Sequence, residues 1–433
     1  MKVIFDISVL GWAQKDNKAR TGVFRVIENL LAQLFQDPRV ELFLCSIDGN
    51  FENCISYLRE KGYGDSHFIY PGKKREIPLF YKIVYSKYFR EEWWRTRSTL
   101  FPLFFLFAFI DKVFALKKMR RAIPKQYLNS HFIFHSPFLP IPEYIRLSNI
   151  SKVITIYDII PILYPKYFVN SKFHLIHKIV GSIDRETSVI AISECTKSDF
   201  CKYRPDIDPS QVFVTYLAAS ESFYKVSDQD SIDKIKTKYE IKSKKYILTL
   251  CTIEPRKNLE VIIRAFSKLV ISRDVPDTDL VLVGTKGWNY DAIFNEIELS
   301  TEIKEKIVVT GYAADSDLAQ LYSGAVCFVY MSFYEGFGLP PLEAMKCGIP
   351  VIVSNSSSIP EVIGNAGILL EPTDEEGLIR NLLRVLTDRT LREDLSRKAI
   401  AQAKKFDWRG CERQTVQAYS NNKVPETAKI FLN

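Results

Sequence analysis

One stretch decides the fold, Phe333-Tyr-Glu-Gly-Phe-Gly-Leu-Pro-Pro-Leu-Glu-Ala-Met-Lys-Cys-Gly-Ile-Pro350. The run before it, 325–330, is apolar and rich in β-forming residues, so it predicts a buried strand. Glycines follow, and then Pro340 and Pro341, which favour a first helical turn because their missing N–H groups need no partner there. A strand, a glycine-rich turn and a helix start bring free backbone N–H groups and a positive dipole end together. Such a site suits a phosphate or a cluster of sugar hydroxyl groups.

Two glutamates, Glu335 and Glu343, lie eight residues apart in this stretch. With Pro341 near the first helical position, Glu343 should fall in the first turn of the helix, while Glu335 stays on the loop. One carboxylate can then face the reacting end of a ligand and the other a more distant hydroxyl group. The alternative is an ordinary strand–loop–helix unit with two surface glutamates, which is the usual case for this spacing taken alone.

Length and composition point to two globular domains. The chain has 433 residues, which exceeds one typical hydrophobic core. Its apolar content of 47% and charged content of 25% are typical of a folded protein. Its eight cysteines are scattered, without a C-x-x-C or zinc spacing, which suits reduced thiols in a cytosolic protein. The N-terminus begins directly as a strand, so we expect no signal peptide.

Positive charge is concentrated in residues 73–125. Fourteen Lys and Arg against four acidic residues give this segment a net charge of +10, whereas the whole chain carries +8. Trp93, Trp94 and an apolar run, 100–110, accompany the charge. The run is too short to span a bilayer, which needs ~20 residues, but the segment suits a helix lying in a membrane interface. The alternative is a core helix hairpin; nucleic-acid binding is disfavoured because the aromatic residues are mostly Phe in an apolar block.

Strand-like and helix-like segments alternate in both halves of the chain, which predicts parallel sheets covered on both faces. We expect an N-terminal domain over 1–220 with 73–125 as an insertion, and a C-terminal domain over 221–411. A polar stretch, 219–243, should connect them, and a tail, 412–433, could cross back to the first domain. The expected strands are 3–7, 40–45, 131–135, 153–157, 188–192 and 212–217, then 246–251, 280–283, 307–310, 326–330, 351–353 and 368–370.

A second motif, Leu250-Cys-Thr-Ile-Glu-Pro-Arg-Lys-Asn-Leu259, lies between a predicted strand and a predicted helix. Arg256 and Lys257 should therefore lie at the rim of an interdomain cleft, where two cations can neutralise a diphosphate. The alternative is a basic helix start, which is unfavourable because cations oppose the dipole at a helix N-terminus.

These motifs resemble those of the retaining GT-B glycosyltransferases of family 4, which are also called glycosyl transferases group 1. Within that family they resemble bacterial mannosyl- and rhamnosyltransferases. The resemblance is most specific over 246–372 and strongest in the Glu-Gly-Phe-Gly core. It implies a GT-B fold, with two doubly wound, Rossmann-like domains facing a deep cleft. The C-terminal domain would hold the donor nucleotide and the N-terminal domain the acceptor. The resemblance also implies retention of anomeric configuration without a metal or other cofactor.

The resemblance assigns roles to individual residues. Arg256 and Lys257 would contact the donor phosphates, Glu335 the donor sugar and Glu343 the ribose hydroxyl groups. Gly22 lies in Arg20-Thr-Gly-Val-Phe-Arg25, which is similar to the Thr-Gly-x-x-Arg turn of the family. Gly311 and Tyr312 would contact the base of the donor nucleotide. Backbone N–H groups of the glycine-rich turn would contact its phosphates. The donor-binding set is Gly22, Gly311, Tyr312, Gly336, Phe337, Gly338, Leu339 and Glu343.

A third motif, Thr155-Ile-Tyr-Asp-Ile-Ile-Pro161, follows a predicted strand of the first domain. The relatives usually carry Thr-x-His-Asp-x-x-Pro, with the histidine reaching the donor sugar. Tyr157 replaces this histidine, and a phenol can hydrogen-bond a hydroxyl group but carries no positive charge near neutral pH. We predict Asp158 as a catalytic residue and Tyr157 as an acceptor-side residue; the alternative for Asp158 is a turn or helix cap. A later loop motif carries Glu361, which we expect to be structural.

The sequence therefore predicts a hexosyltransferase that moves a hexose or deoxyhexose from a nucleotide sugar to a glycan. The acceptor is expected to be lipid-linked, at the inner face of the cytoplasmic membrane, in surface-polysaccharide synthesis. Four Asp-x-Asp triplets, at 206/208, 228/230, 277/279 and 315/317, are predicted to be loops rather than metal sites. A sugar-nucleotide epimerase, a glycan phosphorylase and a non-catalytic sugar-nucleotide-binding protein remain as alternatives. The sequence shows neither acid–base residues for the first nor a pyridoxal-phosphate lysine for the second.

Overall fold

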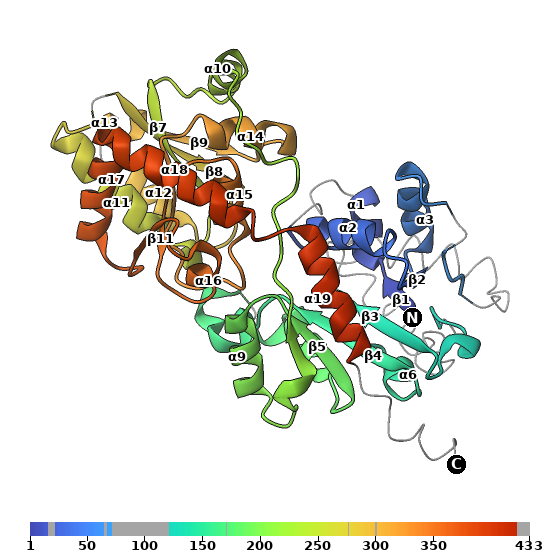
Figure 1. The fold of residues 1–433 in the computed structure, drawn as a ribbon. Helices are drawn as coiled ribbons and strands as arrows, with labels where there is room; N and C mark the ends of the chain where they lie inside the picture. Colours follow the sequence, from blue (N-terminus) through green and yellow to red (C-terminus); the bar gives the residue numbers. More distant parts are fainter. Residues whose placement is uncertain are drawn as a thin grey trace, which may run out of the picture.

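The computed structural model contains two parallel sheets, one in each half of the chain (Figure 1). It describes residues 1–15, 22–64, 67–71, 121–169, 171–275, 277–298 and 301–421. Most of the basic aromatic segment 73–125 and the tail beyond 421 lie outside the described residues, as do Arg20 and Thr21. Among the helices that are described, none is long and apolar enough to cross a membrane.

The first sheet has the strand order β2-β1-β3-β4-β5-β6, with every neighbouring pair parallel. The chain runs from β1 outward to β2 and then returns to β3, so the order reverses between β1 and β3. The strands are β1 (Lys2–Asp6), β2 (Glu41–Cys45), β3 (Phe132–Ser136), β4 (Ser151–Ile156), β5 (Thr187–Ala191) and β6 (Val212–Val214).

The second sheet has the order β12-β11-β10-β7-β8-β9, again all parallel, and reverses between β7 and β10. Loops that follow the two strands at such a reversal diverge and leave room for a ligand. The two predicted doubly wound domains are therefore confirmed. The strands are β7 (Lys245–Leu250), β8 (Thr278–Val283), β9 (Ile307–Gly311), β10 (Cys327–Tyr330), β11 (Val351–Ser354) and β12 (Ile368–Leu370).

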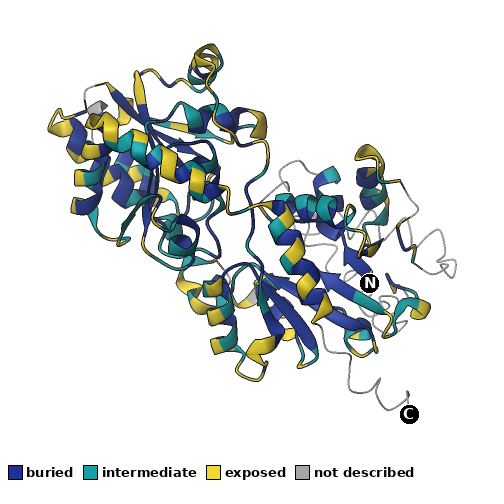
Figure 2. Ribbon diagram, viewed as in Figure 1, coloured by how far each residue is buried: buried dark blue, intermediate teal, exposed yellow. Residues whose placement is uncertain are grey.

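Both faces of each sheet are covered, as expected for parallel strands (Figure 2). Strand β4 is buried along its whole length. Successive side chains of the strand enter different apolar clusters, because Val153 belongs to one cluster while Ile154 and Ile156 belong to the other. The near-continuous apolar runs that predicted the strands thus reflect burial on two sides.

Helices and short 3-10 turns connect the strands. In the first half they are α1 (Ser8–Lys15), α2 (Gly22–Leu34), α3 (Phe51–Glu60), η5 (Lys125–Tyr127), α6 (Glu143–Arg146), α7 (Ile160–Leu163), η6 (Pro165–Tyr167), η7 (Ser171–Phe173), α8 (Leu175–Gly181), α9 (Glu194–Tyr203) and η8 (Pro209–Gln211). In the second half they are α10 (Gln229–Lys238), η9 (Pro255–Lys257), α11 (Leu259–Ile271), α12 (Asp291–Ile297), α13 (Thr301–Glu305), α14 (Asp315–Ser323), α15 (Leu339–Lys346), α16 (Ile359–Ile363), α17 (Glu375–Thr387), α18 (Arg389–Ala403) and α19 (Trp408–Ser420).

The polar connection predicted over 219–243 is not a plain linker, because it contains α10. Asp228 caps this helix by accepting a hydrogen bond from the N–H of Asp230. The helix exposes most of its residues and buries Ile232, so a surface helix accounts for the polar composition.

The chain passes between the domains a second time before α19, which packs on α2, β5 and β6 of the first domain (Figure 1). A buried histidine fastens this helix. His135 on β3 contacts the Tyr419 hydroxyl through Nδ1 at 2.7 Å and Thr155 Oγ1 through Nε2 at 2.9 Å. Burial lowers the pKa of His135 to about 3, so its ring stays neutral and can take part in both hydrogen bonds.

We predict that Tyr419→Phe lowers the free energy of unfolding by about 1–3 kcal/mol, because one nitrogen of the buried His135 ring loses its partner. Urea denaturation of the purified protein measures this. Tyr224→Phe is the control, since Tyr224 is 55% exposed, and it should change stability by less than about 0.5 kcal/mol. Equal stability of the two variants would contradict the role given to His135.

Candidate active site at the junction of the two domains

Glu335 lies on the loop that follows β10, and its carboxylate is held by two cations. Its Oε1 accepts hydrogen bonds from the Lys257 ammonium at 2.6 Å and from the Tyr330 hydroxyl at 2.8 Å. Its Oε2 lies 3.0 Å from Nη1 of Arg256. Strands β7 and β10 are parallel neighbours, so the loops that follow them leave the sheet at the same edge, on the two sides of the strand-order reversal. The structure therefore brings together three residues that the sequence singled out in two separate motifs.

The charges of this cluster stabilise one another. Burial raises the pKa of Glu335, but the attraction of Arg256 and Lys257 outweighs it and lowers the pKa to about 2. Burial lowers the pKa of Arg256, whereas Glu335 and Glu254 raise it, and the net change is upward. Glu335 and Arg256 are therefore ionised at neutral pH. A carboxylate in this state accepts hydrogen bonds and pairs with cations but has no proton to donate.

Arg256 ties the two loops together. Its guanidinium donates to Glu254 Oε1 at 2.7 Å and to the Tyr334 carbonyl at 2.6 Å. Its Nε is buried and has no hydrogen-bond partner, so one donor of the group is unused. Glu254 itself is buried; it was not among the predicted site residues, although it lies inside the Glu-Pro-Arg-Lys-Asn motif.

The serine run 356–358 fixes the backbone of the Glu335 loop. One of its hydroxyl groups accepts the N–H of Glu335 at 2.8 Å. A second donates to the Phe333 carbonyl at 2.7 Å. The third lies 2.9 and 2.8 Å from the carbonyl oxygens of Glu335 and Phe337. These serines were not predicted, because hydroxyl groups that hold a backbone leave no spacing pattern in a sequence.

The glycine-rich turn reaches the first domain at Gly336. A Cβ atom there would lie 2.2 Å from the Tyr157 carbonyl oxygen, so only glycine allows this approach. Phe337 is buried and packs its ring against two other aromatic side chains, which leaves only its backbone for a ligand. Gly338 has a φ of 117°, a left-handed conformation that suits glycine, and Leu339 begins α15.

The predicted position of Glu343 in the first helical turn is wrong. Helix α15 begins at Leu339, so Pro340 and Pro341 are its second and third residues and Glu343 its fifth. The carboxylate is buried; it accepts a hydrogen bond from Tyr322 at 3.0 Å and lies 3.6 Å from Arg25 Nη1. Burial raises the pKa of Glu343, Arg25 and Tyr322 oppose this, and the result is about 7.

Gly22 and Arg25 bring the first domain to the same helix. Gly22 begins α2, and a Cβ atom there would lie 3.8 Å from Leu339 Cδ1. Arg25 forms an ion pair with Asp315 as well as approaching Glu343. Arg25 was not among the predicted site residues, although it is the arginine of the Thr-Gly-x-x-Arg turn that the sequence shows.

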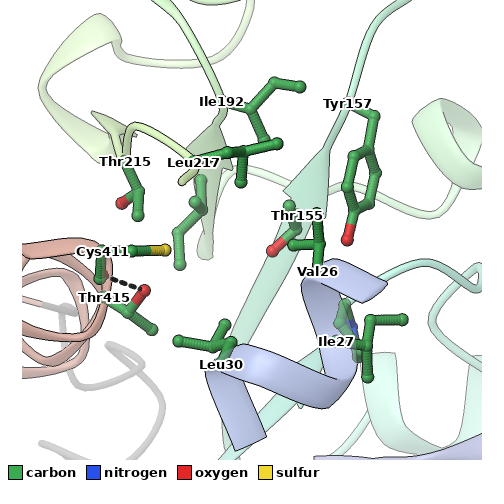
Figure 3. A pocket seen from close by; sticks show the side chains of 12 residues that line it. Val26, Ile27, Leu30, Thr155, Tyr157, Ile192, Thr215, Leu217, Cys411 and Thr415 are labelled. Atoms are coloured by element: carbon green, nitrogen blue, oxygen red, sulfur yellow. Dashed lines mark hydrogen bonds between the residues drawn. The ribbon is translucent and has the colours of Figure 1, made fainter. Parts of the chain in front are cut away.

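Asp158 and Tyr157 lie on the first-domain side of the junction. Asp158 Oδ1 accepts the N–H of Ile160 at 2.9 Å, which is the turn-capping role foreseen as its alternative. Burial raises the pKa of Asp158, while the charge of Arg256 lowers it and that of Glu335 raises it. The carboxyl group therefore interacts electrostatically with the charged cluster. The Tyr157 ring points into a small pocket of the first domain (Figure 3). Its backbone, rather than its phenol, meets the turn at Gly336.

Gly311 and Tyr312 lie apart from this cluster, at the end of the outer strand β9. Gly311 has a φ of 70°, and Tyr312 is 66% exposed, so its ring is open to a planar ligand. Asp315 begins the next helix, α14, and forms an ion pair with Arg25. Because Arg25 also approaches Glu343, it links the end of β9 with the Glu343 side of the site.

The prediction that all four Asp-x-Asp triplets are loops is wrong for three of them. Asp230 lies in α10, Asp279 in β8, and Asp315 and Asp317 in α14. Several of their carboxylates pair with protein groups: Asp317 binds Lys238 and Tyr239, and Asp279 accepts two backbone N–H groups.

Comparison with known proteins identifies the chain. Residues 231–402 match the family described as glycosyl transferases group 1. Over 289 residues the chain is 33% identical to O-antigen chain mannosyltransferase B of Escherichia coli, which covers 66% of this chain and 74% of that protein. The chain belongs to the glycosyl transferases group 1 family. This glycosyltransferase is also 30% identical over 268 residues to the serotype-specific mannosyltransferase WbdA of Escherichia coli, over 61% of this chain and 32% of that longer protein.

Solved structures agree on the fold. HepE of Anabaena, determined in complex with UDP and glucose, aligns with a TM-score of 0.62 at 17% identity, over 97% of this chain and 99% of that one. WaaG, a glycosyltransferase involved in lipopolysaccharide biosynthesis, aligns with a TM-score of 0.59 at 14% identity, over 97% and 100%. The glycosyltransferase therefore has the GT-B fold that its motifs predicted.

We predict that Glu343→Gln changes the pH dependence of stability. The pKa of Glu343 rises from 4.5 to about 7 on folding, so the wild type loses stability as pH increases between these values, by up to about 3 kcal/mol. The glutamine does not titrate, so the stability of the variant relative to the wild type should increase from pH 5 to pH 8. Thermal unfolding across this range measures it.

Glu298→Gln, at an exposed side chain, is the control and should follow the wild type at every pH. A constant difference between Glu343→Gln and the wild type over this range would contradict the raised pKa.

Proposed function

We propose that this glycosyltransferase moves mannose from a nucleotide sugar to a growing surface polysaccharide, with retention of anomeric configuration and without a metal ion. The observation that carries the proposal is the cluster of Arg256 and Lys257 around Glu335 at the strand reversal of the second sheet. The names of the relatives, which are O-antigen mannosyltransferases, support the sugar and the class of acceptor. The structural neighbour with bound UDP and glucose supports a nucleotide-sugar donor.

The cations supply the electrostatic part of the reaction. As the bond between the sugar C1 and the diphosphate oxygen breaks, negative charge grows on the leaving group. Arg256 and Lys257 are already fixed at the site and largely removed from water, so they stabilise this charge without reorganisation.

Glu335 is assigned to the donor side of the reaction. In the proposed mechanism its carboxylate faces the donor sugar and keeps the two cations in place. The acceptor hydroxyl attacks C1 from the side of the leaving group and gives its proton to the departing phosphate oxygen, so the configuration at C1 is retained. Because Glu335 is ionised, we assign it to hydrogen bonding and charge stabilisation rather than to proton transfer. We assign Asp158 to the acceptor side, because it follows Tyr157, whose carbonyl meets the glycine-rich turn at Gly336.

The acceptor is proposed to be a lipid-linked glycan at the inner face of the cytoplasmic membrane. The support is the composition of residues 73–125, whose positive charge and tryptophans suit an anionic lipid surface. Peripheral contact of this kind would place the enzyme where its acceptor is anchored.

The first test measures transfer or hydrolysis of GDP-mannose and UDP-glucose by the purified protein. We predict that Lys257→Ala and Glu335→Ala each lower turnover by about 100- to 1,000-fold, the range found when one preorganised electrostatic group is removed. Glu376→Gln on α17, at a side chain that is 71% exposed, should leave turnover unchanged.

Thermal stabilisation by GDP, UDP, dTDP and ADP identifies the nucleotide, because the matching one should raise the melting temperature most. Stabilisation without any turnover would favour the non-catalytic binding protein, and absence of both would refute the proposed function. A glycosyl-enzyme trapped on Glu335 or Asp158 would overturn the same-face mechanism.

A separate prediction concerns the membrane. Binding to vesicles that contain anionic phospholipid should fall at least several-fold when Trp93 and Trp94 are both replaced by Ala, since interfacial tryptophans contribute to membrane anchoring. Vesicle co-sedimentation measures this, and wild-type binding should weaken as salt concentration rises. Trp288→Ala, in the second domain, is the control. Unchanged binding by the double variant would exclude this segment as the anchor.

A further inference from the structure

The first turn of α9 lies between the two loops that carry the site. Ser193 Oγ donates to the Gly336 carbonyl at 2.8 Å, in the loop of Glu335. Thr196 Oγ1 lies 3.2 Å from the same carbonyl and 3.3 Å from the Tyr157 carbonyl, next to Asp158. The single proton of this hydroxyl group can go to either oxygen. One turn of helix therefore touches both the donor side and the acceptor side of the proposed reaction.

A carboxylate from the second domain caps the first turn of α9. Glu361, in α16, accepts the backbone N–H groups of Glu194 and Cys195 at 2.8 Å each. These are two of the N–H groups that a helix N-terminus leaves unpaired, and a negative charge there is favourable with respect to the helix dipole. The second domain thus caps a helix of the first.

Glu361 and Glu335 belong to one hydrogen-bonded unit. Helix α16 begins directly after the serine run 356–358, which holds the backbone of the Glu335 loop at three points. A further contact joins the Glu335 loop to α9, because the Tyr334 hydroxyl donates to Asp199 Oδ2 at 2.7 Å. Movement of α9 relative to Glu361 would therefore be transmitted to Glu335.

Helix α9 also has a cap from its own domain. Ser193 belongs to the first domain and already caps α9 by accepting the N–H of Thr196 at 3.0 Å. Glu361 is thus an additional contact whose geometry exists only when the two domains meet. This separates its role from the stability of either domain.

We propose that Glu361 is a positioning residue of the transferase: by capping α9 it holds the domains in the arrangement that sets Glu335 against Asp158. This inference rests on the proposed function for its kinetic consequence. Glu361 contacts the backbone of α9 and the Tyr216 side chain rather than the cation cluster, so it acts on turnover and not on the affinity for the donor nucleotide. The expectation from sequence that Glu361 is structural is thereby refined.

The test is Glu361→Ala in the full-length protein. We expect kcat to fall about 10- to 100-fold, since misplacement of reacting groups by about 1 Å has effects of this size. The Kd for the stabilising nucleoside diphosphate and the melting temperature should stay close to wild type. Glu361→Gln keeps an oxygen that can accept an N–H group and should recover part of the lost kcat. Glu194→Ala, at an exposed side chain in the same helical turn, is the control and should keep wild-type kcat.

The proposal is overturned if Glu361→Ala keeps wild-type kcat, if its nucleotide Kd weakens in proportion to the loss of kcat, or if Gln restores nothing. A measurement that does not depend on turnover distinguishes failure of this inference from failure of the proposed function. Small-angle scattering should show a larger radius of gyration for Glu361→Ala than for the wild type, and equal values would also refute the contact between the domains.

Discussion

The pairing of Glu335 with Arg256 and Lys257 is the interaction on which the rest of the site depends. Two cations can be removed from water at this depth only because a carboxylate and further acceptors surround them, since an unpaired buried charge costs several kcal/mol. The cations follow β7 and the carboxylate follows β10, and these strands are neighbours only because the order of the second sheet reverses between them. The two cations are thus already desolvated and held in fixed positions in the folded protein.

The loop that carries Glu335 also makes the contact between the two domains. Gly336 brings its backbone against Tyr157, and no side chain could be accommodated at this distance. On one side of this contact Arg25 reaches Asp315 and Glu343, and on the other Glu361 caps α9. The Arg25–Asp315 pair and the Glu361 contacts are polar and partly exposed, so the two sides of the junction are joined by polar bridges rather than by one large apolar interface.

Much of the fold could be predicted because apolar runs mark buried parallel strands. Helix α11 (Leu259–Ile271) follows the basic motif where a helix was predicted, and all twelve expected strands are present. Two elements show where local pattern fails. Helix α10 was hidden because only Ile232 among its residues is buried. Helix α15 begins two residues earlier than expected, because prolines are tolerated at its second and third positions once Gly338 has turned the chain.

The sequence by itself determined the chemical groups and their order along the chain: the basic pair after one strand, the glutamate and glycines after another, and membership of a glycosyltransferase family. Only the tertiary structure decided which groups meet. Glu343 pairs with Arg25, Glu361 caps α9 and His135 binds Tyr419, although each pair is separated by more than a hundred residues. Such contacts depend on how segments far apart in the chain pack together, and local periodicity carries no information about that packing.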